Sequence, residues 1–205
     1  MIGLGNWRET CYNRQSDLHV KMSRSISIQA AVAVTPSYGI GKAGKLPWQQ
    51  VGHRYSKDLK YFQKVTTQTS DPNKKNAVIM GRVTWESIES KYKPLPNRVN
   101  VVLSSNVAYT TISSTDEVLY ATSLQDAMNK LTNDSRIENA VVIGGAKLFE
   151  EAMMHPLCTG FHVTFVDHEY DCDTFLTDAT IAKLKTLTPR SVSDIIVENE
   201  VSLRY

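Results

Sequence analysis

The 205-residue sequence predicts an α/β fold in which a central, mostly parallel mixed sheet has an antiparallel C-terminal edge and helices on both faces. Two observations lead to this prediction. Apolar, β-prone runs alternate with amphipathic helical patterns as far as Ala152, and this alternation is typical of a parallel sheet. From Gly160 onward the pattern becomes β-rich, which indicates strands that pair antiparallel at one edge.

The first third of the chain predicts a strand, a loop and a helix. Ile26–Val34 is apolar without alternation, as expected of a strand that is buried on both faces. Gly39–Gly44 matches the glycine fingerprint of dinucleotide-binding folds, but Pro47 keeps the chain extended where that fold requires a helix. We therefore expect Gly39–Trp48 to be a mobile loop that ends in an exposed aromatic side chain. A helix follows over Ser56–Thr67, with its apolar residues on one stripe.

The middle of the chain predicts three further strands and one helix. An apolar strand covers Asn76–Met80, a helix runs over Arg82 to about Ser90, and a proline-stiffened loop covers Lys91–Arg98. Two strands follow, over Val99–Leu103 and Glu117–Tyr120.

The last third predicts two helices and four strands. Ser123 is placed to cap a helix that runs to Leu131, with Asp126 three residues after the cap. A strand over Asn139–Ile143 leads into a helix over Gly145–Ala152. The β-rich end predicts three strands, over Phe161–His168, Arg190–Glu198 and Val201–Tyr205.

Composition limits the functional classes. The net charge of +2 and the lack of any basic run argue against a nucleic-acid partner, and no apolar run approaches the ~20 residues of a membrane span. Cys11, Cys158 and Cys172 form no CxxC pair, which favours reduced thiols and a cytoplasmic location. No histidine pair has metal-ligand spacing, so we expect no metal site and interpret His162 and His168 as surface or strand residues.

Residues 1–24 predict a disordered N-terminal extension, and residues 25–205 predict one domain. Basic residues in the extension leave a mitochondrial presequence open, whereas Glu9 and Asp17 argue against it. Met22 offers a second start, so an upstream-start artefact also stays open.

Two segments repeat one local pattern. In Val78–Ile88 and again in Val141–Phe149, an apolar strand reaches glycine and then opens a helix that begins with a cation, Arg82 in the first and Lys147 in the second. Helix N-termini present unpaired N–H groups and the positive end of a dipole, which favour anions. The two junctions therefore predict a ligand with several phosphates, such as a nucleotide cofactor.

Three polar side chains are candidates for binding a second ligand. Asp58 shares the apolar face of its helix with Phe62 and Val65, where a carboxylate needs hydrogen-bond donors. A flat heterocycle with an amidine-like N–H pair would supply them, although the helix dipole alone also favours an acid in the first turn. Arg98 follows a stiff Pro-Leu-Pro turn and is either solvated or placed to grip a carboxylate. Thr164 suits a β-strand.

Several motifs of this chain, and their order over roughly residues 26–198, resemble those of the dihydrofolate reductase family. The segments that carry the resemblance are Ala31-Val32-Ala33, Gly39-Ile40-Gly41, Leu46-Pro47-Trp48, Asp58-Leu59-Lys60-Tyr61-Phe62, Met80-Gly81-Arg82-Val83-Thr84-Trp85-Glu86-Ser87-Ile88, Pro94-Leu95-Pro96-Asn97-Arg98, Ile143-Gly144-Gly145 and Asp173-Thr174-Phe175. The longer linkers around Asp71–Lys75 and Lys91–Lys93 resemble eukaryotic or protist members, including reductase domains fused to thymidylate synthase.

The resemblance implies reduction of 7,8-dihydrofolate to tetrahydrofolate, for one-carbon and thymidylate metabolism, by hydride transfer from NADPH to C6 and protonation at N5. Asp58 would accept hydrogen bonds from the pterin ring, and Thr164 would hold that carboxylate and a water. Trp48 would be the third catalytic residue, at the end of a glycine loop that closes over the nicotinamide. Arg98 would bind the glutamate α-carboxylate. The other substrate-binding residues implied are Val32, Ala33, Leu59, Phe62, Ser87, Ile88, Leu95 and Ile143.

For NADPH, the resemblance implies that Arg82 with Ser104 and Ser105 faces the 2′-phosphate and that the Gly144–Gly145 peptide is cis. The cofactor-binding residues implied are Ala33, Ile40, Gly41, Gly81, Arg82, Val83, Thr84, Leu103, Ser104, Ser105, Gly144, Gly145, Ala146, Lys147, Leu148 and Phe149. Dihydrofolate and antifolate inhibitors are the expected partners, and the chain is expected to be a monomer unless it is fused to thymidylate synthase.

The chain departs from the family's pattern by one insertion and three replacements. The insertion is Val51–Tyr55, and the replacements are Val83 for a commonly basic residue, Phe149 for tyrosine and Thr177 for proline. The chain stops at Tyr205, within the expected last edge strand. Two alternatives stay open: a catalytically impaired folate or nucleotide binder, and a pyrimidine reductase of riboflavin synthesis on the same fold. Asp58 and Arg98 argue against the second.

Overall fold

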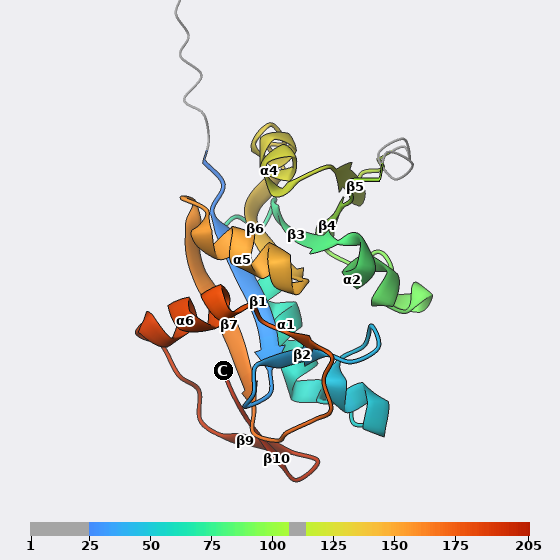
Figure 1. Ribbon diagram of the computed structural model, residues 1–205. Coiled ribbons are helices and arrows are strands. Elements are labelled where there is room, and N and C mark those ends of the chain that lie inside the picture. The colour runs from blue at the N-terminus through green and yellow to red at the C-terminus, as the bar shows by residue number, and fades with distance from the viewer. Residues whose placement is uncertain (1–24, 107–113) are drawn as a thin grey trace, which may run out of the picture.

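An eight-stranded sheet runs through the computed structural model, which describes residues 25–106 and 114–205 (Figure 1). The predicted extension over residues 1–24, including Cys11, lies outside the described residues. The strands of the large sheet are β1 (Ile28–Val34), β3 (Lys75–Gly81), β4 (Arg98–Leu103), β5 (Val118–Ala121), β6 (Ile137–Gly144), β7 (Cys158–Val166), β9 (Ile196–Glu198) and β10 (Val201–Arg204).

The order of these strands is β5-β4-β3-β6-β1-β7-β10-β9. Every neighbouring pair from β5 to β7 is parallel, whereas β10 is antiparallel to both β7 and β9. The predicted fold class, a mostly parallel mixed sheet with an antiparallel C-terminal edge, is therefore confirmed.

Helices cover both faces of the sheet, as predicted. They are α1 (Ser56–Thr67), α2 (Arg82–Ser87), α4 (Leu124–Thr132), α5 (Ala146–Met154) and α6 (Asp178–Thr186). Successive residues of β3 point to opposite faces: Ile79 packs with residues of α4 and α5, and Met80 packs with residues of α1 and α2. Figure 1 shows α5 in front of the sheet and α1 behind it. Within the described ranges, no helix is long and apolar enough to span a membrane.

The helix ends predicted from the sequence agree with the structure for α1 and for the start of α4, but not for the end of α2. Helix α1 begins and ends where the sequence predicts, and the Ser123 hydroxyl caps α4 by accepting the Asp126 N–H at 3.1 Å. Helix α2 is shorter than predicted, because Ile88 adopts an extended backbone and packs against the sheet. A separate 3-10 turn, Ser90–Tyr92, follows it.

The region after β7 differs from the prediction in two ways. Helix α6 is absent from the sequence prediction, because its apolar repeat is short: Ile181 and Leu184 are its apolar residues that pack against the core, and its fully buried residue is the polar Thr180. Thr177 begins this helix by accepting a backbone N–H at 3.2 Å, so the residue that replaces the usual proline acts as a cap. The strand predicted over Arg190–Glu198 is wrong up to residue 195, where exposed apolar side chains stay outside the sheet, and only Ile196–Glu198 pairs.

The glycine-rich segment is only in part the loop that the sequence predicts. Gly39–Gly41 forms strand β2, which pairs antiparallel with β8 (Thr174–Phe175) in a small second sheet. No α-helix begins between Gly44 and Ser56. The glycine fingerprint therefore lacks the helix that a Rossmann fold requires.

The predicted exposure of Trp48 is wrong. Trp48 lies in a 3-10 helix over Pro47–Val51 and is 2% exposed. Its ring centre lies 5.5 Å from that of Tyr55 and 6.1 Å from that of Tyr170. Because Tyr55 belongs to the Val51–Tyr55 insertion, the insertion supplies part of the cover that buries Trp48.

The turn of the β9–β10 hairpin offers a test of backbone strain. It passes through Asn199 and Glu200, whose φ angles are 51° and 63°. Glutamate is strained in this left-handed region by about 1 kcal/mol, whereas glycine is not. We expect Glu200→Gly to raise Tm by about 2–4 °C in thermal unfolding. Glu200→Ala retains the strain, so an equal gain in the alanine variant would show that strain is not the cause.

Candidate active site

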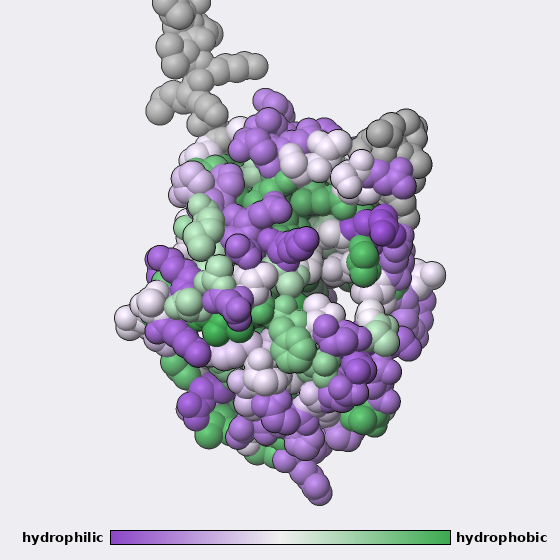
Figure 2. All heavy atoms as spheres, viewed as in Figure 1, coloured by the Kyte–Doolittle hydropathy of each residue, from purple (hydrophilic) through white to green (hydrophobic). Residues whose placement is uncertain are grey.

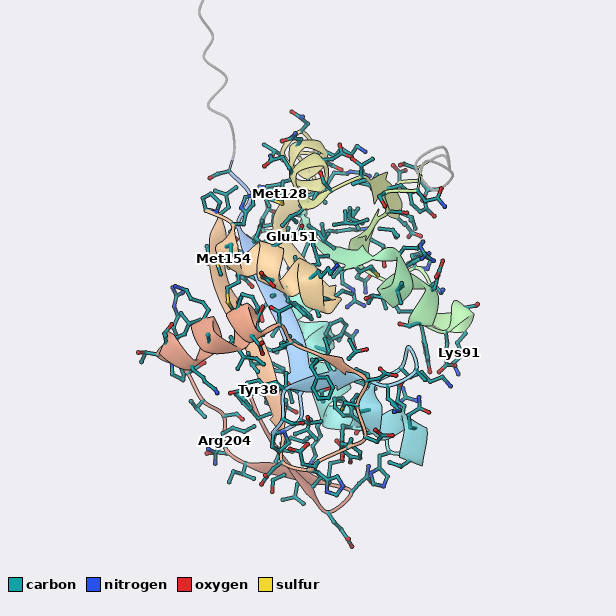
Figure 3. The ribbon with its side chains drawn as sticks, in the orientation of Figure 1. Tyr38, Lys91, Met128, Glu151, Met154 and Arg204 are labelled. Carbon is teal, nitrogen blue, oxygen red and sulfur yellow. The ribbon has the colours of Figure 1, made fainter. Side chains whose placement is uncertain are left out.

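A cavity of about 1330 Å³ opens at the carboxyl ends of the parallel strands. Its walls come from α1, α2, the N-terminal end of α5 and the segment between β2 and the 3-10 helix. Figure 2 shows the surface hollowed in this region. Figure 3 draws the surrounding side chains, with Glu151 marking α5 and Lys91 marking the segment after α2. Because ligands of open α/β sheets bind at this edge, the cavity is the candidate active site.

The two glycine junctions predicted from the sequence lie together in this cavity. Met80 of β3 is paired with Gly144 of β6. A Cβ on Gly144 would lie 3.2 Å from the Thr84 hydroxyl of α2, and the φ angle of Gly144 is 133°, so glycine permits both the backbone and the close approach of α2. The Gly144–Gly145 peptide is cis, as the resemblance implies.

The structure brings together almost all of the predicted site residues. The residues expected to bind substrate all line the cavity: Val32, Ala33, Leu59, Phe62, Ser87, Ile88, Leu95, Arg98 and Ile143. The residues expected to bind the cofactor also line it: Ala33, Ile40, Gly41, Gly81, Arg82, Val83, Thr84, Leu103, Ser104, Ser105, Gly144, Gly145, Ala146, Lys147, Leu148 and Phe149. Asp58 and Thr164 line it as well, but Trp48 does not, because its ring is buried in the neighbouring aromatic cluster.

Asp58 is a buried carboxylate on the cavity wall. It lies in the first turn of α1 and is 6% exposed, and Thr164 of β7 is 3% exposed. Burial raises the pKa of the Asp58 carboxyl, a hydrogen bond from the Thr164 hydroxyl opposes this, and the charge of Glu198 adds to it, so the pKa lies above its usual value. Such a carboxylate is suited to accepting N–H groups of a bound ligand.

Arg98 is a buried cation on the same wall. It is 5% exposed, and it donates from Nε to the Pro96 carbonyl at 3.0 Å and from Nη1 to the Thr66 hydroxyl at 2.6 Å. Burial lowers its pKa to about 10, so the guanidinium stays charged at neutral pH. No carboxylate among the described residues forms an ion pair with it. This environment favours a ligand that brings its own carboxylate.

Two cations and two hydroxyls border the glycine junctions. Arg82, the first residue of α2, donates from Nη1 to both carboxylate oxygens of Glu86, at 2.7 and 2.9 Å. Lys147 is exposed in the first turn of α5. Ser104 is buried at the end of β4 and Ser105 is exposed next to it. This set of donors is suited to phosphate oxygens.

A chain of hydrogen-bonded side chains that the sequence did not predict lies on the cavity wall. The Tyr61 hydroxyl lies 3.2 Å from Nδ1 of His162, and Nε2 of His162 lies 3.1 Å from Oε1 of Gln29. Tyr61 and His162 line the cavity. His162, interpreted from the sequence as a surface or strand residue, is a half-buried residue of strand β7. Spacing is the signal that could have identified both residues. Tyr61 is three residues after Asp58 on a helix and His162 is two residues before Thr164 on a strand, so each shares a face with a predicted site residue.

Comparison with known proteins places these features in one family. The family model for dihydrofolate reductase matches residues 27–195. The chain is 37% identical to the dihydrofolate reductase of Drosophila melanogaster over 177 residues, which are 85% of this chain and 91% of that protein. Among solved structures, Schistosoma mansoni dihydrofolate reductase matches with a TM-score of 0.69 and 36% identity, over 88% of this chain and 96% of that one.

The chain is also similar to part of longer proteins. It is 45% identical to bifunctional dihydrofolate reductase-thymidylate synthase 2 of Arabidopsis thaliana over 151 residues, which are 72% of this chain and 26% of the plant protein. The match therefore spans about a quarter of the bifunctional protein's length. The extent of the family match and the coverage of the fly protein show that this chain belongs to the dihydrofolate reductase family.

Proposed function

We propose that the protein reduces 7,8-dihydrofolate to 5,6,7,8-tetrahydrofolate with NADPH as the reductant. One observation carries the proposal: a buried carboxylate, Asp58, and a buried cation, Arg98, lie in the same cavity as the two glycine junctions. Membership in the dihydrofolate reductase family supports folate as the substrate class.

Asp58 and Arg98 fit the two ends of this substrate. Dihydrofolate has a pterin ring with an N–H pair at one end and a glutamate at the other. Asp58 accepts hydrogen bonds from N3 and the 2-amino group, which orients the ring and favours its protonation at N5, while Thr164 holds the carboxylate. Arg98 binds the glutamate α-carboxylate, because a buried guanidinium gains most from a charged partner.

The junction residues fit a nicotinamide dinucleotide phosphate. Gly144 lets Thr84 of α2 approach β6 closely, so the two cations Arg82 and Lys147 border one cavity. Arg82 holds the 2′-phosphate with the serines at the end of β4, and Lys147 holds a phosphate at the N-terminal end of α5. NADPH supplies the hydride when bound. The protein binds and orients both molecules and limits the access of water.

The preference for NADPH over NADH tests the cofactor assignment. We expect NADPH to be oxidised faster than NADH in the presence of dihydrofolate, as followed by the loss of cofactor absorbance. Arg82→Gln is expected to lower kcat/KM for NADPH by about 10- to 150-fold, which corresponds to a charge-assisted hydrogen bond of about 1.5–3 kcal/mol, and to leave the value for NADH unchanged. Lys91→Gln removes an exposed cation that does not line the cavity and is the control.

Two other outcomes would change the assignment. Equal losses for NADPH and NADH in Arg82→Gln would rule out Arg82 as the reader of the 2′-phosphate. If no cofactor is oxidised although NADPH and dihydrofolate each raise Tm, the protein is a folate and nucleotide binder without reductase activity.

A further inference from the structure

The C-terminal hairpin connects the two elements that carry Asp58 and Thr164. Strand β10 pairs with β7, the strand of Thr164, through Leu203 and Val166. Strand β9, on the far side of β10, ends at Glu198, which reaches the first turn of α1, the helix of Asp58. Figure 1 shows the hairpin at the edge of the sheet. The hairpin therefore contacts both the strand that carries Thr164 and the helix that carries Asp58.

Glu198 makes three hydrogen bonds to the start of α1. Its Oε1 accepts the Ser56 N–H at 2.7 Å and the Ser56 hydroxyl at 2.6 Å, and its Oε2 accepts the Lys57 N–H at 3.0 Å. The Lys57 ammonium donates in turn to the Val197 carbonyl at 3.3 Å. One carboxylate thus joins the last part of the sheet to the first turn of the helix.

This contact replaces a local helix cap. Tyr55, the N-cap residue of α1, makes no side-chain capping bond, and the first N–H groups of a helix have no partner within the helix. Glu198 satisfies two of them, and its negative charge lies at the positive end of the helix dipole. Asp58 lies within the same first turn, so its backbone is fixed by the Glu198 contact.

Glu198 also acts on the Asp58 carboxyl through its negative charge. Four groups interact with the Asp58 carboxyl from the elements around it: Thr164 on β7, Tyr61 on α1, Tyr205 after β10 and Glu198 on β9. Burial and the charge of Asp58 raise the pKa of both phenols, so they are neutral where carboxylates titrate. Burial raises the pKa of Glu198, but its hydrogen bonds to Ser56 and Lys57 outweigh this and lower it. The negative charge of Glu198 therefore adds to the effect of burial and raises the pKa of the Asp58 carboxyl.

We propose that Glu198 is a positioning residue for the Asp58 carboxylate, because it anchors the first turn of α1 to the β9–β10 hairpin and places a second negative charge near it. The proposal deepens the function proposed above, and only its effect on turnover rests on that function. Its effect on Asp58 itself is measurable in the free protein.

Glu138 provides a matched control. Its Oε1 accepts the Ser70 N–H at 2.7 Å and its Oε2 accepts the Asp71 N–H at 2.8 Å, so it makes the same kind of carboxylate clamp on two backbone N–H groups. It lies on β6 and does not line the cavity. Glu138→Gln and Glu198→Gln each weaken such a clamp, but only Glu198→Gln removes a charge that acts on Asp58.

The experiment is a titration of the Asp58 carboxyl by carbon-13 NMR in the ligand-free protein, with its signal assigned from Asp58→Asn. We expect both glutamine variants to lower Tm by about 2–4 °C, because each weakens a hydrogen-bonded clamp. We expect the midpoint of the Asp58 titration to fall in Glu198→Gln, since a neighbouring negative charge raises a carboxyl pKa, and to stay at the wild-type pH in Glu138→Gln.

The outcomes separate this proposal from the proposed function. An unchanged Asp58 midpoint in Glu198→Gln, or an equal shift in Glu138→Gln, overturns the role of Glu198. If the wild-type protein oxidises NADPH with dihydrofolate, the pH profile of turnover should move to lower pH in Glu198→Gln only. A shifted midpoint in a protein that shows no turnover supports the role of Glu198 and refutes the reductase function.

Discussion

Asp58→Asn is expected to lower the turnover of dihydrofolate by about a hundredfold or more, while the fold and NADPH binding are retained. A carboxylate accepts hydrogen bonds at both oxygens, whereas asparagine presents one acceptor and one donor. The amide therefore places N–H against N–H at one of the two pterin contacts, and it removes a negative charge that favours protonation of the ring. Steady-state turnover and the Tm increase caused by NADPH measure the two parts of this prediction.

Another first-turn aspartate supplies the control for this variant. Asp178 begins α6, is exposed and does not line the cavity, so Asp178→Asn should leave turnover unchanged. Asp58→Asn should not reduce Tm, because it removes a buried charge. Turnover near the wild-type value in Asp58→Asn would refute the role of this carboxylate.

Arg98→Met is expected to raise KM for dihydrofolate by about 30-fold or more, with a smaller effect on kcat. The reason is the loss of a buried contact to the glutamate carboxylate, which is worth ~2 kcal/mol or more. Steady-state kinetics at saturating NADPH measure both constants. Arg136→Met is the control, because Arg136 is half exposed, is paired with Asp134 at 2.8 Å and does not line the cavity. A KM for dihydrofolate within a few-fold of the wild-type value would refute the proposal that Arg98 binds the substrate.

The same variant should not lower the thermal stability of the ligand-free protein. Burial lowers the pKa of Arg98 from its usual value to about 10, so the folded state binds the proton less tightly than the unfolded state. This group therefore destabilises the fold at every pH below about 10, and the penalty is lost only as pH rises above that value. Methionine removes the penalty. The Thr66 hydroxyl remains satisfied in the variant, because it also donates to the Phe62 carbonyl at 2.6 Å. A large fall in Tm would contradict this account.

The sequence predicted the features that depend on short-range patterns. Helix α1 has its apolar stripe within one continuous segment, and both of its ends agree with the structure. The residues of both glycine junctions lie within short strand-to-helix segments, and they line one cavity as the pattern indicated. The carboxyl ends of parallel strands meet at one edge, so local patterns were sufficient to place Gly81 and Gly144 together.

The features that the sequence did not predict depend on contacts between distant segments. Trp48 ends a glycine-rich segment and was expected to be exposed, but Tyr170, far along the chain, covers it. The spacing of His162 from Thr164 indicates which side of the strand it lies on, but its hydrogen bond to Tyr61 joins β7 to α1, two elements far apart in the sequence. The cap of α1 is likewise invisible to a local search, because Glu198 lies 142 residues after Ser56.

The distant cap of α1 also fixes the order in which the site is completed during synthesis. Chains leave the ribosome N-terminus first, so β1, α1, β3, β6 and α5 are synthesised before the β9–β10 hairpin. A nascent chain that has reached Met154 already contains both glycine junctions, whereas the first turn of α1 still lacks its Glu198 partner. The residues of the cavity that face the glycines are thus synthesised before the hairpin that caps α1. The first turn of α1, which holds Asp58, gains its cap only after Glu198 has emerged.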